Sequence, residues 1–414
     1  MTDDKPDAVA ESQDETLAPS SPLGRRVLFT IVSLLIAATI WLPCMHFPFQ
    51  PDLKAYRVAS GIAPRARSLA ARHLALWEDP ALRAEELRKM RGSNAEWDFM
   101  GRTYLVLAFA NMGLREPASK DKYLRVIDAI IDDTLAVERD KGMYHFLMGY
   151  ARVGRFVSRP PRSMFIDGEI ALMLGARRML EEKPAYKRLL TERVDLMLGY
   201  MIWSPVLSGE SYPDECWTFC NTVALASMTI ADALDGTDHS ELINAWLASA
   251  KKNLVDSKTG LLVSSYGFGG GHRDGPEGSS IWMAAHCLQL IDEDFAQDQY
   301  ARAKKELGRS TLGFGYAREW PETWRGPADV DSGPIIPLFE ASPGASGLAV
   351  LGASAFGDTE FLSQLLTSLE GIGLPQERDG ALQYCASNQV GDAVLLYALV
   401  QGPLWEEARK RSQR

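Results

Sequence analysis

Cysteine and histidine are both scarce in this sequence. Its 414 residues include 5 cysteines and 6 histidines, too few and too scattered for a disulfide scaffold or a zinc ribbon. Positive charge is not in excess either, since 44 Lys and Arg residues stand against 54 Asp and Glu residues, giving a net charge of −10. We therefore expect no metal and no nucleic-acid partner.

Long apolar runs are equally rare. Hydrophobic residues make up 46% of the chain and charged residues 24%, which are ordinary values for a folded soluble protein and exclude a polytopic membrane protein. Residues 1–24 are acidic and almost without large apolar side chains. Such a segment cannot bury enough surface to fold, so we predict a disordered tail.

One apolar run does stand out near the N-terminus. Arg25 and Arg26 are followed by no charged residue until Asp52, and Val27–Met45 is about as long as a helix that crosses a bilayer core. We predict that residues 25–46 form a retained, single-pass signal-anchor helix. The two arginines would keep the N-terminus cytoplasmic and place the rest of the chain on the periplasmic side. A cleaved signal peptide and an interfacial helix are the alternatives.

The rest of the chain has apolar residues at helical spacing, and no convincing alternating strand pattern. Phe99, Thr103 and Leu107 fall on one stripe, as do Ile166 and Ile170. Helices are predicted over 66–90, 98–113, 120–138, 164–182, 187–203, 219–234, 239–254, 280–306, 342–355, 358–370 and 389–402. About eleven or twelve successive helices without a fixed-period repeat predict an all-α fold, with residues 47–414 forming one (α/α)6 barrel. Loops at one end of such a barrel line a cavity.

The turn Ser208–Asn221 concentrates reactive side chains, among them Tyr212, Trp217 and two cysteines. Cys216 and Cys220 are four residues apart and would share one face of a helix. Cys220 is either a weak acid or hydrogen-bond donor in a pocket, or one of two small buried hydrophobic residues.

Two acidic segments are candidates for proton transfer. Asp167 and Glu169 begin a predicted helix, where a carboxylate either caps the helix or, inside an apolar pocket, gains a raised pKa and acts as a general acid. Asp329 and Asp331 are close enough to share a proton, which suits acid catalysis. The alternative for this pair is an Asx-turn ahead of a Gly-Pro bend.

The run Pro213–Asp238 resembles the linalool dehydratase/isomerase family. Residues that fit include Pro213, Asp214, Cys220, Asn221, Val223, Ala224, Asp232, Leu234, Ala245, Trp246, Ser265, Tyr266 and Gly357–Glu370. The resemblance covers most of residues 95–400 and is strongest over about 205–270 and 327–372. It implies an (α/α)6 barrel, often oligomeric, that acts outside the cytoplasm without metal or organic cofactor. The implied chemistry adds water to, or removes it from, a monoterpene alcohol and rearranges allylic alcohols.

The sequence departs from this family at several positions. A family cysteine falls on Ser211, a helix-borne histidine on Glu169, and a pocket tyrosine on or near Trp282. A further family cysteine has no counterpart, because no cysteine occurs between residues 44 and 216. The resemblance therefore implies a pocket in which carboxylate and indole replace imidazole and thiol, so that the substrate differs from linalool.

These observations together predict a membrane-anchored lyase or isomerase for an isoprenoid or similar apolar substrate. The reaction would be dehydration, hydration, allylic rearrangement or proton-initiated cyclisation. Glu169 or the pair Asp329 and Asp331 would give the proton, and Cys220 with Tyr212 would orient the hydroxyl. The predicted substrate-binding residues are Ser211, Asp214, Trp217, Tyr266 and Trp282. A substrate that partitions into the bilayer explains why the enzyme is anchored there, and a homo-oligomer is possible.

Two other classes of function remain open. A carbohydrate-active (α/α)6 enzyme would use paired carboxylates across an open cleft, with tryptophans as stacking platforms. A non-catalytic binding protein could keep the same scaffold. A closed apolar cavity with one acid favours the isoprenoid substrate, whereas an open cleft with two facing carboxylates favours the glycan.

Overall fold

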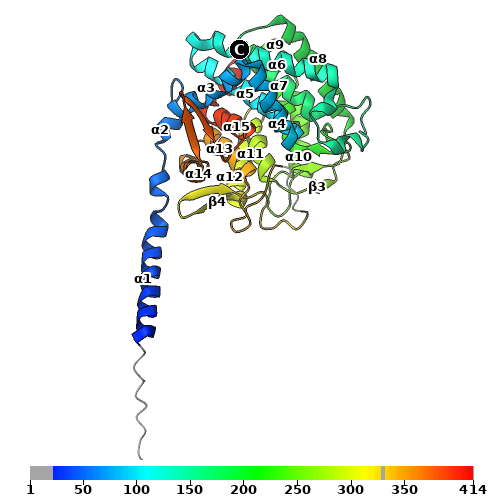
Figure 1. Cartoon of the computed structure of the whole chain (residues 1–414). Helices are drawn as coiled ribbons and strands as arrows, with labels where there is room; N and C mark the ends of the chain where they lie inside the picture. Colours follow the sequence, from blue (N-terminus) through cyan, green and yellow to red (C-terminus); the bar gives the residue numbers. More distant parts are fainter. Residues whose placement is uncertain (1–21, 328–331, 414) are drawn as a thin grey trace, which may run out of the picture.

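One helix stands apart from the rest of the molecule. The computed structural model describes residues 22–327 and 332–413. Helix α1 (Pro22–Cys44) projects from the folded body as an isolated rod (Figure 1). Its apolar side chains are exposed, including Leu28, Leu35 and Trp41. Among the described residues it is the one helix long and apolar enough to cross a membrane, as the apolar run predicted.

Six helices form the centre of the body. They are α5 (Ala95–Arg115), α7 (Met164–Leu180), α9 (Thr218–Asp235), α11 (Gly278–Leu288), α13 (Pro343–Ala355) and α15 (Gln389–Val400). Each packs against the next in this order and α15 packs against α5, so the contacts close into a cycle. Nearly every residue of α7, α11 and α15 is buried. We call these six the inner helices, and the predicted, mostly helical fold is confirmed.

A second set of helices packs on the inner six. These are α3 (Pro64–Glu78), α4 (Pro80–Ser93), α6 (Lys120–Lys141), α8 (Pro184–Trp203), α10 (Ser240–Asn253), α12 (Glu293–Leu307) and α14 (Thr359–Ile372). Helices α6, α8, α12 and α14 each contact the inner helix that precedes them in the chain, while α3 contacts α15 and α4 contacts α5. They are amphipathic: α6 buries Ile127, Ile130 and Ile131 and leaves its charged residues outside.

The C-terminal helix α16 (Pro403–Ser412) covers one end of the inner helices. It contacts α5, α7 and α9. The Trp405 ring stacks on that of His286 with 4.8 Å between centroids, and its indole N–H donates to the His286 carbonyl at 3.1 Å. This end of the body is therefore closed by packed side chains.

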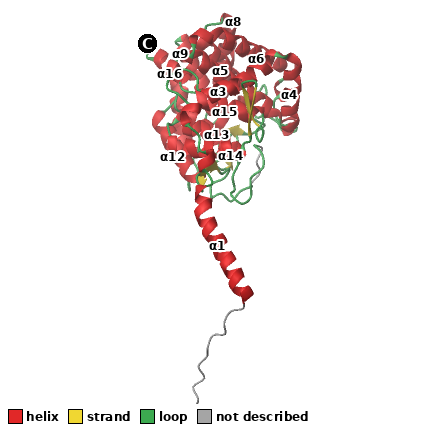
Figure 2. Ribbon diagram, turned by 60° about the vertical axis from the view of Figure 1, so that its left-hand side comes forward, coloured by secondary structure: helices red, strands yellow, loops and turns green. Residues whose placement is uncertain are grey.

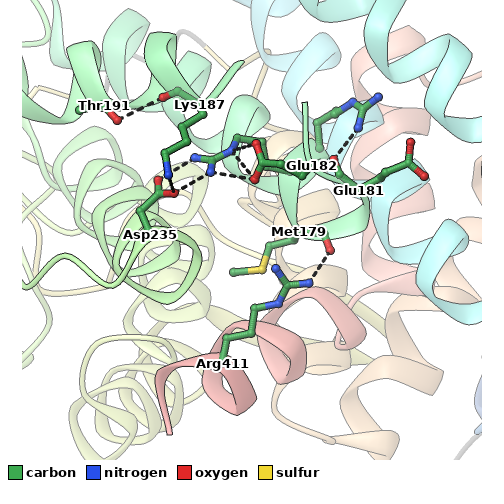
Figure 3. A network of polar contacts seen from close by, with 9 residues as sticks. Met179, Glu181, Glu182, Lys187, Thr191, Asp235 and Arg411 are labelled. Atoms are coloured by element: carbon green, nitrogen blue, oxygen red, sulfur yellow. Dashed lines mark hydrogen bonds and ion pairs between the residues drawn. The ribbon is translucent and has the colours of Figure 1, made fainter. Parts of the chain in front are cut away.

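A network of ion pairs ties helices together near this closed end (Figure 3). The buried Arg178 guanidinium binds Asp235 at 2.7 Å and Glu182 at 2.9 Å, and Lys187 also reaches Asp235, at 2.9 Å. Arg411 of α16 donates to the Met179 carbonyl at 3.2 Å. Because the buried guanidinium faces two carboxylates, its charge is compensated where solvent cannot reach it.

The opposite end of the body carries short strands and long loops, and α1 projects from it (Figure 2). Strands β1 (Cys216–Trp217), β2 (Ser265–Tyr266) and β3 (His272–Asp274) form one antiparallel sheet. Two hairpins pair β4 (Gly308–Thr311) with β5 (Phe314–Ala317) and β6 (Pro375–Arg378) with β7 (Ala381–Tyr384). Both hairpins turn on two residues with positive φ, which is the type I′ geometry.

The structure differs from the predicted elements in three places. The run 66–90 is two helices, because Asp79 precedes Pro80 and its carboxylate accepts from the Ala81 and Leu82 N–H groups to start α4. The run 280–306 is likewise divided, since Asp292 caps α12. Strands were not predicted, yet the described residues form seven. Each is two to four residues long, too short for a period-two pattern to emerge.

Candidate active site

A cavity of about 1390 Å³ lies at the strand-bearing end of the inner helices. Each of the six inner helices contributes lining residues, either from its N-terminal turns or from the segment just before it. The positive ends of the helix dipoles therefore converge on this cavity, and they favour negative charge there. Carboxylates are indeed numerous in its lining: Glu96, Glu215, Asp274, Glu277, Glu319 and Asp392.

Most of the remaining lining is apolar or aromatic. It includes Trp97, Met100, Tyr150, Phe165, Trp217, Phe219, Leu348, Val350, Leu365 and Leu395. A cavity of this composition suits a largely apolar ligand that carries one or a few polar groups.

The turn 208–221 forms one wall and is held rigidly. The Glu210 carboxylate accepts hydrogen bonds from the N–H groups of Val157, Ser158 and Asp214 at 2.7 to 2.8 Å. The Asn221 side chain bonds both the N–H and the carbonyl of Gly209, at 2.8 and 3.1 Å. These bonds satisfy backbone groups that would otherwise be buried without partners, and they fix the side chains that the turn presents to the cavity.

Two side chains of this turn, Tyr212 and Trp217, pair with carboxylates of the lining. The Tyr212 hydroxyl donates to Glu96 and accepts from the Met148 N–H at 3.0 Å, and its ring stacks on Tyr150 at 4.7 Å. The Trp217 indole N–H donates to Glu215 at 2.6 Å. The structure thus brings both predicted residues to the cavity.

Glu169 lies one helical turn below Phe165, inside the cycle of inner helices. Its carboxyl is buried and accepts a hydrogen bond of 2.5 Å from the Thr103 hydroxyl. Burial raises the pKa of this carboxyl to about 8, the Thr103 hydrogen bond lowers it, and the negative charge of Glu96 raises it further. Glu169 sits in the second turn of α7, beyond the reach of the helix dipole. It therefore holds its proton at neutral pH.

Other polar groups from the inner helices surround Glu169. When Glu169 is ionised, its negative charge raises the pKa of Tyr104 of α5, Cys220 of α9 and Cys287 of α11. Cys220 lines the cavity, and burial raises the pKa of its thiol well above the usual range, so that it remains a neutral S–H. The Tyr104 hydroxyl is buried with no hydrogen-bond partner among the described residues. We call Glu169, Thr103, Tyr104 and Cys220 the floor cluster.

Glu319 forms part of the opposite wall. Its carboxylate accepts from the N–H and hydroxyl of Ser279 at 2.9 and 2.5 Å and from the Ser342 hydroxyl at 2.6 Å. Ser279 belongs to the first turn of α11, and Ser342 caps α13. Glu319 therefore joins the starts of two inner helices while it lines the cavity.

Four predicted binding residues lie outside the cavity lining. Tyr266 is buried behind the turn, with its hydroxyl 2.8 Å from that of Ser208. The Trp282 ring packs against Tyr300 and Phe361 of outer helices. Ser211 is buried within the turn itself, and Asp214 binds Arg273 at 2.6 Å. An aromatic residue on α11 can face inward or outward, and the apolar pattern of the helix does not distinguish the two.

Asp329 and Asp331 lie outside the described residues. The residues that follow them, Ser332, Gly333 and Pro334, line the cavity.

Sequence reasoning missed Glu96, Glu215, Glu277, Glu319 and Tyr104. Glu96 carried a usable signal, because Asn94 two residues earlier is a strong N-cap and its side chain accepts from the Glu96 N–H at 2.8 Å. Such a cap places Glu96 in the first turn, at the end of the helix where the loops gather. Glu319 had no such signal, since its role depends on serines that are far away in the chain.

Residues 210–390 match the family model of linalool dehydratase/isomerase. The resemblance predicted from the 213–238 run is confirmed over this segment. It includes most of the turn, Cys220 and Glu319, the inner helices α9, α11 and α13, and only the start of α15.

Solved structures were compared as well. One is a selenomethionine derivative of the GH76 alpha-mannanase of Bacteroides thetaiotaomicron, with a TM-score of 0.47 and 12% identity over 75% of this chain and 87% of that one. Another is a possible member of the GH105 family from Salmonella enterica serovar Paratyphi A, with a TM-score of 0.44 and 14% identity over 75% of this chain and 83% of that one.

Proposed function

We propose that the protein is a lyase or isomerase that acts on an isoprenoid or similar apolar alcohol or alkene by acid–base chemistry. The observation that carries the proposal is a buried, protonated Glu169 that is not itself in the lining but lies one helical turn from Phe165, which lines a largely apolar cavity. The match of residues 210–390 to the linalool dehydratase/isomerase family supports the same chemistry. Neither a metal nor an organic cofactor is needed for it.

The proposed reaction begins with proton transfer from the floor cluster. Glu169 gives its proton to the substrate hydroxyl, with Cys220 at the cavity surface as the neighbouring S–H donor that orients this oxygen. Tyr104, whose hydroxyl lacks a partner among the described residues, would hold the water that leaves. Tyr212 donates to Glu96, and its hydroxyl would position the other end of the allylic system.

Loss of water from an allylic alcohol leaves a carbocation, and the aromatic lining suits this intermediate. Trp97, Tyr150 and Trp217 offer ring faces whose quadrupoles stabilise positive charge. Return of water at another carbon gives the rearranged alcohol, direct loss of a proton gives the alkene, and attack by a second double bond gives a cyclic cation. In each case the released proton returns to the Glu169 carboxylate, which leaves a neutral product. The shape of the cavity would select among these outcomes.

For the scaffold, we infer that residues 47–414 form an (α/α)6 barrel. The closed order of contacts among the six inner helices and the outer layer support this reading. We further infer that α1 is a retained anchor with a cytoplasmic N-terminus, since Arg25 and Arg26 flank the apolar segment. Full-length protein should then stay in membranes during a carbonate wash, and release or cleavage near Cys44 would contradict the anchor.

A carbohydrate-active enzyme is a second candidate, because carboxylates occupy both walls of the cavity. Glu96 lies on α5, and Glu277 precedes α11, which is opposite α5 in the cycle of inner helices. Glycoside hydrolysis needs two such carboxyl groups on either side of the scissile bond.

The test is a mass-spectrometric screen of the purified full-length chain in detergent. One set of reactions contains monoterpene, sesquiterpene and diterpene alcohols, the other contains oligosaccharides, and Glu169→Gln is the matched control. Conversion of an isoprenoid alcohol that is lost in Glu169→Gln supports the lyase or isomerase. Cleavage of an oligosaccharide that Glu277→Gln abolishes would instead support the second candidate, and no conversion in either set would favour a non-catalytic binding protein.

A further inference from the structure

Large apolar side chains are exposed together at the end of the body from which α1 projects. They are Leu312, Ile336, Leu338, Phe339, Ile372 and Leu374, with exposed fractions between 41% and 84%. We call these six residues the collar. A cluster of exposed apolar side chains of this kind is typical of an interaction surface.

The collar borders the mouth of the cavity. Leu312, Ile336, Phe339 and Ile372 belong to its lining, and so do two residues at the end of the apolar N-terminal segment, Leu42 and Met45. The collar and the end of α1 therefore surround the same opening.

Aromatic contacts fix the end of α1 against the collar's hairpin. The His46 ring lies 4.3 Å from that of Phe47 and 6.4 Å from that of Phe314, and Phe49 lies 6.2 Å from Phe314. Phe314 begins β5, directly after the turn that carries Leu312, and the β4–β5 hairpin packs on α14, which ends at Ile372. Figures 1 and 2 both show β4 or its neighbour α14 beside the point where α1 leaves the body.

Two collar residues adopt backbone conformations that are unfavourable for leucine. Leu312 and Leu374 have φ of 51° and 53°, in the left-handed region that favours glycine or asparagine over leucine. Both side chains are also exposed, at 44% and 61%, so neither burial nor backbone preference explains a leucine there. An apolar partner outside the chain would explain both.

We propose that the collar docks on the lipid bilayer that α1 crosses, so that the mouth of the cavity opens onto the lipid phase. The occupant is the headgroup and acyl boundary of the bilayer, because α1 continues directly into the rim of the same opening. Docking itself does not depend on catalysis. Its consequence, that an apolar substrate enters from the membrane without crossing water, rests on the proposed function.

Spin-label accessibility of the full chain in phosphatidylcholine nanodiscs tests the docking. Exposed Cys385 and partly exposed Cys44 are first replaced by serine, and the other three cysteines are buried. Labels are then placed one at a time by Leu338→Cys and Leu374→Cys in the collar. Leu35→Cys in the middle of α1 is the lipid reference, and Lys410→Cys, exposed on α16 at the closed end, is the aqueous reference.

Each label reports its surroundings through two relaxation agents, oxygen, which concentrates in lipid, and a water-soluble nickel chelate. The ratio of oxygen to nickel accessibility at the two collar sites should exceed that at Lys410→Cys several-fold and approach that at Leu35→Cys. A ratio equal to that at Lys410→Cys would overturn the proposal, because the collar would then face water. Low accessibility to both agents would also overturn it, since a second copy of the chain or another protein would cover the collar. A protein that docks but converts no alcohol would leave the docking intact and contradict only the proposed function.

Discussion

Two carboxylic acids lie two residues apart on α7 and meet opposite surroundings. Asp167 faces outward, where it binds Arg162 with Nε–Oδ2 at 2.9 Å and Arg193 at 2.5 Å. Glu169 faces inward, where Thr103 donates a single hydrogen bond and no cation approaches it among the described residues. Asp167 is therefore an ion-paired structural residue, whereas Glu169 is a neutral acid that can donate a proton. The difference follows from the face of the helix on which each side chain lies.

The same contrast separates the two ends of the body. At the closed end, Arg178, Lys187 and their carboxylates neutralise one another (Figure 3). At the cavity, Glu96, Glu215 and Glu319 pair with hydroxyl, indole or backbone N–H groups instead. No Lys or Arg is among the described residues that line the cavity, although Arg72 binds Asp392 of the lining at 2.6 Å. A cavity with few fixed cations suits a reaction whose intermediate is itself positive.

The largest effect is expected from Glu169→Gln. The substitution keeps the shape of the side chain but removes the acid, so turnover should fall by about 10² to 10⁴. Asp331→Asn, which alters the rival acid in the loop, should lower turnover less. Initial rates on the alcohol identified by the screen measure both. Near-normal turnover in Glu169→Gln beside an inactive Asp331→Asn would move the acid to the loop.

Asp167→Asn should act on stability rather than on chemistry. It leaves Arg193, whose side chain is 11% exposed, without one of its carboxylates. Breaking a buried ion pair in this way costs about 3–5 kcal/mol in the free energy of unfolding. Urea denaturation measures the loss, and turnover per folded molecule should be retained. Glu192→Gln, which breaks the exposed pair with Arg188, is the control and should change stability by about 0.5 kcal/mol or less. Equal losses in the two variants would refute the structural role of Asp167.

The pH dependence of stability and turnover should also report the raised pKa of Glu169. Burial raises the pKa of Glu169 in the folded protein to about 8 from the ordinary value of 4.5, so the folded protein binds one more proton than the unfolded chain between these values. Its contribution to stability is present at pH below about 4.5 and is lost as the pH rises through about 8. Turnover should fall over the upper part of the same range, because the fraction of Glu169 that carries a proton decreases. Denaturation measured from pH 5 to pH 9, a range that includes this pKa, should show a smaller decrease in the free energy of unfolding for Glu169→Gln than for the parent chain. Parallel curves would contradict the raised pKa.

The smallest effect on stability is expected from Tyr104→Phe. Its hydroxyl has no partner among the described residues, so removing it should leave the melting temperature unchanged or raise it slightly. If the hydroxyl holds the leaving water, turnover should still fall by about tenfold, or about 1.4 kcal/mol in the barrier. A loss of stability without a loss of turnover would make Tyr104 a packing residue only.

Much of this arrangement could be predicted from sequence patterns, and the limits have physical causes. Apolar spacing located the inner helices, and the length of Val27–Met45 identified α1. Spacing alone left Glu169 open between a cap and a pocket acid, and resemblance to a family was needed to favour the interior. Asp79-Pro80 and Asp379-Gly380 were readable signals for a helix break and a hairpin. The partners of Glu319 and the outward orientation of Trp282 depend on tertiary contacts, which no local pattern encodes.

Infrared spectroscopy of the carboxyl groups tests the central claim most directly. At neutral pH, a protonated Glu169 should contribute a C=O stretching band of a neutral carboxylic acid. The difference between the parent chain and Glu169→Gln isolates that band, and Asp167→Asn should leave it in place. The account predicts a band that is present at pH 7 and disappears as the pH rises through about 8. A difference spectrum without this band at pH 7 would show that Glu169 is ionised and would contradict the account.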